Sequence, residues 1–282
     1  MVPTDALRSA RVRLSYEDAI LERYRFRQSK VNWFSHESAR RLAYTGSIMR
    51  ERSVATATLA KEIASCRDCP RLVAWREEIA LAKRRMYRAH DYWGRPVAGF
   101  GDVDARIVVV GLAPGAHGAN RTERAFTGDR SGDFLFAALH RAGLANQATS
   151  VAADDGLVLR DVFIVLAVRC APPGNAPRRD EISRCARFVD AEAALLPRAR
   201  VAVALGALAW TAWIDHLARA GGTIPKPRPR FSHAAEAHLE GARTALVGSY
   251  HVSQQNTQTG RLTAAMFDAV VARACVLAER GN

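Results

Sequence analysis

The chain has 282 residues, of which 49% are hydrophobic and 24% are charged. These proportions are those of a globular protein. No apolar run approaches the roughly 20 residues that span a bilayer, and the N-terminus lacks the apolar core of a secretion signal. We therefore expect a cytoplasmic protein with no membrane partner.

The basic residues outnumber the acidic ones, 41 to 28, which gives a net charge of +13. An excess of this size favours a polyanionic partner. Because no basic amphipathic helix with a wide apolar face is present, nucleic acid is favoured over an anionic membrane surface. Within the cytoplasm, we expect the protein to associate with the nucleoid.

Residues 1–55 are interpreted as a basic N-terminal extension, partly helical or disordered. Arg alternates there with acidic and aromatic residues, and no core pattern is visible. Met49 is an alternative start of the chain, since the first motif follows soon after it. Residues 56–282 are predicted to form a second domain, which carries the motifs.

From residue 56 onward, short apolar runs alternate with amphipathic patterns of helical spacing, which is typical of an α/β protein. Strands alternating with helices predict a parallel sheet that is covered on both faces. In such folds the ligand site lies beyond the carboxyl ends of the strands. The predicted strands are 105–114, 161–170, 199–206 and 243–251, and the predicted helices are 131–144, 178–197, 207–222 and 260–280.

The segment 221–241 joins the third helix to the fourth strand and is predicted to be a long surface excursion. Its Lys226, Arg228 and Arg230 alternate with Pro. Two interpretations stay open for these side chains, contact with a phosphate backbone or simple solvation.

Four of the five cysteines form two pairs, Cys66 with Cys69 and Cys170 with Cys185. Four thiolates on loop and helix ends can meet beside one edge of the sheet and bind a metal. The wide second pair favours a [4Fe–4S] cluster over zinc, and a metal-free set is the remaining alternative. The fifth, Cys275, lies on the apolar stripe of the last helix and is predicted to be a small buried hydrophobe.

The loop after the first predicted strand, residues 111–133, is rich in glycine, which lets the backbone approach a ligand closely. Phe126 is predicted to be an exposed aromatic that stacks on something flat. Asp129 stands just before a helix and is a candidate catalytic carboxylate, although it is equally well explained as a helix cap.

Two further loops carry hydrogen-bonding groups. Asn175 lies in a Pro-rich turn after the second strand, where its amide can match a nucleobase edge. After the fourth strand, His251 is followed by a polar run, 253–259, which can present N–H groups and hydroxyls to phosphate. Arg261 adds a charge to that run.

Four motifs, GLAPGAHGANRT…FTGD, VRCAPPGN, C-x2-C…C-x14-C and YHVSQQNTQTGRLT, resemble those of the uracil-DNA glycosylase superfamily. The specific branch is family 5, the iron–sulfur type B enzymes, and the resemblance covers residues 60–275. It implies a three-layer α/β/α sandwich around a four-stranded parallel sheet, and a [4Fe–4S] cluster. It also implies removal of uracil and other deaminated bases, such as hypoxanthine, from DNA.

Several positions depart from the patterns of related enzymes. Other uracil glycosylases carry an acid or amide in the first motif, where this chain has Leu112 and Ala113. Asp129 is therefore the best candidate for positioning the attacking water. The family usually has Ala and Gly where this chain has Gly115 and Glu123. Val252 replaces the Pro of the common His-Pro-Ser motif, so we expect an altered stiffness of that loop.

The resemblance predicts the following roles. His251 donates a hydrogen bond to the uracil O2, Phe126 stacks on the base, and Asn175 reads the base edge or holds the water. The backbone of the first motif, including Gly111 and Ala113, approaches the substrate. Phosphate contacts come from Ser253, Thr257, Thr259 and Arg261, and Gln255 enters the vacated stack.

We expect a monomer that acts on double- and single-stranded DNA. Two rival functions stay open. One is a non-catalytic protein that binds damaged DNA or abasic sites, and the other is an iron–sulfur redox regulator that binds DNA.

Overall fold

The computed structural model describes the backbone of residues 36–279 and the side chains of residues 47–279. The chain divides into two units, Met1–Ile48 and Met49–Asn282, and the second is described below. Helix α2 (His36–Ser65) runs through the predicted boundary at residue 55. The expectation for residues 1–35 lies outside the described residues. None of the described helices combines the length and apolar content that a membrane crossing requires.

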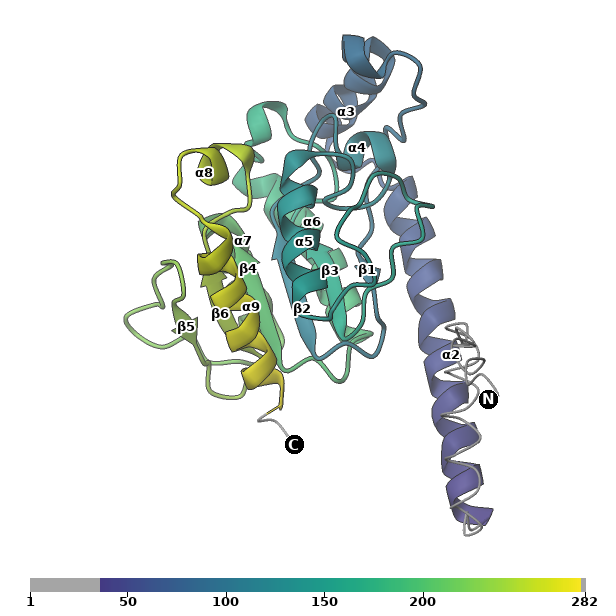
Figure 1. The fold of residues 1–282 in the computed structure, drawn as a ribbon, viewed down its shortest axis with the longest axis vertical. Coiled ribbons are helices and arrows are strands. Elements are labelled where there is room, and N and C mark those ends of the chain that lie inside the picture. Colours follow the sequence, from purple (N-terminus) through teal and green to yellow (C-terminus); the bar gives the residue numbers. More distant parts are fainter. Residues whose placement is uncertain (1–35, 280–282) are drawn as a thin grey trace, which may run out of the picture. The chain divides into compact units, whose positions relative to one another are not determined.

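One mixed sheet of six strands, in the order β1-β3-β2-β4-β6-β5, forms the centre of this unit (Figure 1). Its four middle strands pair in parallel and confirm the four predicted strands. These are β2 (Ile107–Gly111), β3 (Val162–Leu166), β4 (Val201–Leu205) and β6 (Ala245–Ser249). The sheet is wider than the four strands expected, because β1 (Phe100–Gly101) and β5 (Glu236–Ala237) pair antiparallel at its edges.

Helices cover both faces of the sheet, so the three-layer α/β/α arrangement is confirmed (Figure 1). Ile107 and Val109 of β2 pack into the core beneath α5 (Arg130–Arg141) and α9 (Ala264–Glu279). The alternate residues of the same strand pack against α6 (Arg179–Ala194) and α7 (Ala207–Arg219). This alternation explains the uninterrupted apolar runs, because both sides of each strand are buried.

The remaining short elements are α3 (Pro70–Ala82) and the 3-10 turn η1 (Arg85–Tyr87) before β1, α4 (Ala119–Thr122) and the 3-10 turn η2 (Pro173–Asn175) between strands, and α8 (Gln254–Gln258) between β6 and α9. The excursion 221–241 contains β5 and is tied to α7, since Arg228 pairs with Asp215. Arg228 therefore has an acidic partner within the chain.

The strand order predicts where a ligand binds. From β2 the chain passes to β3 on one side and then returns to β4 on the other. Such a reversal opens a crevice at the carboxyl ends of the strands. The loops after β2, β4 and β6 meet at this end, and in Figure 1 α3 and α8 also lie there.

Candidate active site

Phe126 is buried against the carboxyl end of β2 rather than exposed on the surface. Its exposed fraction is 9%, so the predicted exposed aromatic is wrong. The backbone adopts a left-handed φ of 54°, which turns the ring back over β2. A Cβ on Gly111 would lie 2.7 Å from the ring atom Cζ, so Gly111 leaves the space that the ring fills. The ring centroid is 6.3 Å from that of His251, with the planes tilted by 36°.

Asp129 caps helix α5, and one carboxylate oxygen remains free for another use. Its Oδ1 accepts hydrogen bonds from the backbone N–H groups of Ser131 at 3.0 Å and Gly132 at 3.1 Å. Oδ2 points toward the glycine loop, where a Cβ at Gly118 would overlap it and one at Gly115 would lie 3.1 Å away. Within the described residues, Oδ2 makes no hydrogen bond. Burial raises the pKa of Asp129, although the two N–H donors oppose the shift.

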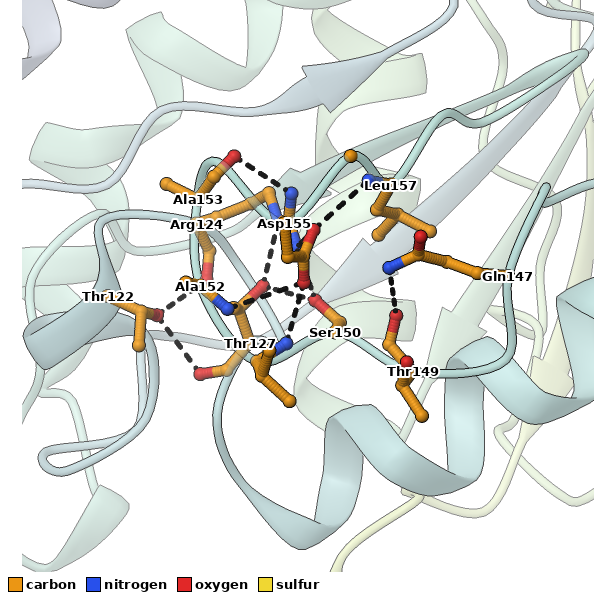
Figure 2. Close-up of polar contacts among 12 residues, drawn as sticks. Thr122, Arg124, Thr127, Gln147, Thr149, Ser150, Ala152, Ala153, Asp155 and Leu157 are labelled. Atoms are coloured by element: carbon orange, nitrogen blue, oxygen red, sulfur yellow. Dashed lines mark hydrogen bonds and ion pairs between the residues drawn. The ribbon is translucent and has the colours of Figure 1, made fainter.

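A buried ion pair between Arg124 and Asp155 braces Thr127 (Figure 2), which lies between Phe126 and Asp129 in the sequence. The Arg124 guanidinium lies 2.7 and 2.8 Å from the two carboxylate oxygens of Asp155. It also donates to the hydroxyls of Thr127 at 3.0 Å and Ser150 at 2.8 Å. Both charged side chains are 8% exposed. Asp155 in turn accepts N–H bonds from its own loop, so two loops form one rigid unit.

His251 stands two residues after the end of β6, and its ring lies near that of Phe126. Asn256 fixes its backbone by donating from Nδ2 to the His251 carbonyl at 2.8 Å. The imidazole itself makes no hydrogen bond within the part of the chain that the structure describes. Burial lowers the pKa of His251, so the ring is neutral near pH 7 and has one N–H to donate.

Val252 anchors the loop that follows. Its side chain is fully buried in the core beneath α5 and α9. Ser253 caps α8, its hydroxyl accepting from the Asn256 N–H at 3.4 Å. The polar side chains beyond the cap, Gln255, Thr259 and Arg261, are exposed at the same end of the sheet. Arg261 lies over the Tyr250 ring at 4.8 Å.

The predicted site residues are not all brought into contact. Asn175 lies in the exposed turn η2 with a φ of 57°, and its side chain makes no hydrogen bond within residues 47–279. Ala113 packs beside the cysteine cluster, not against Phe126. The structure thus joins Gly111, Phe126 and His251, and leaves Asn175 at the rim.

The four paired cysteines line one cavity beside the sheet. Each sulfur faces one N–H donor of an arginine. Three of these donors belong to guanidinium groups and one is a backbone amide. The pairs are Arg76 with Cys170 at 2.9 Å, the Arg169 amide with Cys185 at 3.3 Å, Arg187 with Cys66 at 3.7 Å, and Arg184 with Cys69 at 3.9 Å. The cavity is therefore prepared for negative charge on sulfur.

The four thiols do not form a site for a single metal ion in the structure. Among the described residues, no three His, Cys, Asp or Glu side chains approach closely enough to hold a single ion. Burial raises the pKa of Cys170 to about 12 and that of Cys185 to about 11. As free thiols they stay protonated at neutral pH, so binding of a metal group must displace the protons. Cys275 is only partly buried, against the core beneath α9, and not fully as expected.

Sequence reasoning missed the residues that support the site. Arg124, Asp155 and Asn256 hold the loops after β2 and β6, and Arg76 lies buried beside the sulfurs. Arg124 follows the first motif directly. An arginine within a buried stretch is the one sequence feature that could have identified it as a supporting residue. Asp155 and Asn256 stand in ordinary polar loops, where no pattern distinguishes them.

Comparisons with known proteins agree on one family. A family model described as the uracil DNA glycosylase superfamily matches residues 98–274. A type-5 uracil-DNA glycosylase of Mycobacterium tuberculosis is 52% identical over 217 residues, which cover 77% of this chain and 79% of the relative. That of Thermus thermophilus is 51% identical over 216 residues, 77% of this chain and 95% of the relative. A type-4 uracil-DNA glycosylase of Thermotoga maritima is 34% identical over 120 residues, 42% and 54% of the two chains.

Proposed function

Because the chain belongs to the uracil DNA glycosylase superfamily, we propose that the loops after β2, β3 and β6 together carry out base excision. The enzyme removes uracil from DNA by hydrolysis of the N-glycosidic bond, and so acts in DNA repair. The likeness to these enzymes over most of the chain sets aside the rival binder and redox regulator. The observation that supports the assignment of roles is the pairing of Phe126 with the unbonded His251 imidazole.

His251 stabilises the leaving base. Cleavage places negative charge on the departing uracil, and a fixed N–H donor lowers the energy of that charge. The imidazole suits this role because its lowered pKa keeps it neutral, and no protein acceptor among the described residues competes for its N–H. The hydrogen bond to the uracil O2 forms only after the base has left the stack.

Phe126 and Asn175 select the base. The buried ring offers one flat face, which the left-handed turn at residue 126 holds in place. The amide of Asn175 both donates and accepts, so it tolerates more than one base edge. We extend the substrates on this basis to other deaminated bases, hypoxanthine among them.

Asp129 positions the attacking water through Oδ2 while Oδ1 caps α5. Gly115 and Gly118 of the first motif let Oδ2 approach the backbone of that loop, because a Cβ at Gly118 would overlap Oδ2 and one at Gly115 would lie 3.1 Å from it. Leu112 and Ala113 of that motif supply no acid, so Asp129 replaces the missing group. In its ionised form the carboxylate also faces the positive charge that develops on the sugar.

The polar run after His251 binds the DNA backbone. Ser253, Thr257, Thr259 and Arg261 contact phosphates, and exposed Gln255 enters the emptied stack. Double- and single-stranded DNA are both substrates, because the flipped base and its phosphates are common to both. The protein acts as a monomer at the nucleoid, with residues 56–282 as the catalytic domain and 1–55 as a basic extension.

The four cysteines fit a [4Fe–4S] cluster. The donor set is four thiols around one cavity, and the described residues form no site for a single ion there. The buried Arg76 Nε and Arg169 Nε lack hydrogen-bond partners, as expected beside a charged group that accepts from them. Cys66, Cys69, Cys170 and Cys185 would hold the cluster, whose role is structural because four cysteines leave no open coordination position.

The assay is release of base from duplexes that contain uracil or hypoxanthine, followed by alkali cleavage of the abasic site. We expect excision of both bases by the wild-type protein and at least about 10²-fold slower excision by His251→Ala. Binding without excision of either base would contradict the proposal. Iron and sulfide analysis tests the cluster separately, with about four of each expected per chain.

A further inference from the structure

A basic turn stands on the rim of the active site, and nothing in the reaction described so far uses it. We name the residues from Arg84 to Arg88 the 84–88 turn; it follows α3 and contains η1. Its three arginines are exposed, and within the described residues none of them forms an ion pair. Between them stands Met86, whose exposed fraction is 63%.

The turn is rigidly attached to the first motif. The Tyr87 ring packs inward against the guanidinium of Arg121, at 4.1 Å from its centroid. Arg121 is 8% exposed, and it also donates to the carbonyls of His117 and Gly128, both at 2.9 Å. Gly128 directly precedes Asp129. The same arginine therefore fixes both the catalytic loop and the base of the turn.

A second contact places the turn on the side of the crevice. The Tyr92 hydroxyl lies 3.1 Å from His117 Nδ1 in the loop after β2. The backbone N–H of Arg84 donates to the same Tyr92 hydroxyl at 3.5 Å, which connects the turn to that loop. With Tyr87 directed inward, Met86 and the three arginines are left to face solvent at the same end of the sheet.

We propose that the 84–88 turn is a DNA-binding element in which Met86 wedges into the base stack and the arginines hold phosphates on either side of it. Exposed arginines without acidic partners fit a phosphate backbone by charge. Apolar side chains, methionine among them, serve as wedges that unstack a base step. The turn that carries Met86 is already held in place. Insertion of the methionine into the stack therefore does not have to order a mobile loop. The proposal rests on DNA as substrate, and it is independent of the roles of Asp129 and His251.

The arginines are tested by the salt dependence of binding. The probe is a duplex with 2′-fluoro-2′-deoxyuridine, whose glycosidic bond resists cleavage. Replacing Arg84, Arg85 and Arg88 by Gln should lower the slope of log Kd against log salt by about 2.7, at about 0.9 per phosphate contact. The matched control is Arg160→Gln, an exposed arginine just before β3 at the opposite end of the sheet. An unchanged slope in the triple variant overturns the proposal.

The wedge is tested by fluorescence, with 2-aminopurine opposite the modified uracil. Wild-type protein should raise the fluorescence as the stack opens, and Met86→Ala should lose at least half of that rise while Met86→Leu keeps it. The control is Val158→Ala, whose side chain is 54% exposed at the opposite end of the sheet. A full rise with Met86→Ala refutes the wedge. Because neither readout depends on excision, failure of the catalytic assignments would be seen separately.

Discussion

Asp129 caps α5 in the structure and is proposed to position the attacking water, and two substitutions separate these roles. Asp129→Ala removes both the cap of α5 and the carboxylate, whereas Asp129→Asn keeps a good cap and removes only the charge. The cap consists of hydrogen bonds to the N–H groups of Ser131 and Gly132. Its loss costs about 1 kcal/mol, which lowers Tm by about 2–4 °C in a domain of this size. We expect the Asn variant to melt within about 1 °C of the wild type.

Excision should fall in both variants, because neither carries the carboxylate that positions the water. The expected loss in single-turnover rate is about 10²- to 10⁴-fold. Binding to the 2′-fluoro duplex serves as the control and should change little. A stable Asn variant that excises uracil at the wild-type rate would show that Asp129 is only a helix cap.

The same residue predicts opposite effects of pH on rate and on stability. Burial raises the pKa of Asp129, and the proposed reaction needs the ionised form, so the rate should rise with pH through that pKa. Folding favours the protonated form, so the stability contributed by this group is present in acid and is lost as pH rises through the folded pKa. In Asp129→Asn, the rise of the excision rate with pH on the acidic side of the profile should therefore lose the contribution of this carboxylate. If that rise is unchanged, another group causes it.

Three further predictions concern the supporting structure. His251→Ala should slow single-turnover excision by about 10²-fold or more with little change in binding, and a near-normal rate would exclude the imidazole as leaving-group donor. Arg124→Met leaves Asp155 as an unpaired buried charge and should lower the free energy of unfolding by about 3–5 kcal/mol, measured by chemical denaturation. The double variant with Asp155→Leu should recover part of that loss. Equal stability of the single and double variants would contradict a tight ion pair. Cys170→Ser should lower bound iron, measured by metal analysis against Cys275→Ser as control, and unchanged iron would remove Cys170 from the ligand set.

Much of the fold was predictable because its pattern is local. The four central strands are apolar on both sides, and each is followed by a helix with one apolar face, so their order along the chain implies the layers. The edge strands β1 and β5 were not predictable. Each has only two residues, and the pairing of so short a segment is determined by its neighbours and not by its own composition.

The position of a candidate residue after a strand can be predicted from the sequence, whereas its burial cannot. His251 and Asp129 were singled out by their position in loops after predicted strands, and their catalytic roles stay predictions. Phe126 was placed correctly in the loop but wrongly at the surface, because its burial depends on a left-handed turn and on the missing side chain at Gly111. Arg124 and Asp155 were missed because a long-range ion pair leaves no periodic signal in the sequence.

Because the Arg124–Asp155 pair is buried, the geometry of the site should not depend on the salt concentration. Ionic strength weakens attractions between exposed charges and a DNA backbone, but it hardly screens a pair that is 8% exposed on both sides. Salt sufficient to release the protein from DNA should therefore leave Phe126 and Asp129 held as before. An enzyme eluted from a DNA column in concentrated salt would then return to its substrate on dilution with its catalytic loops already in place.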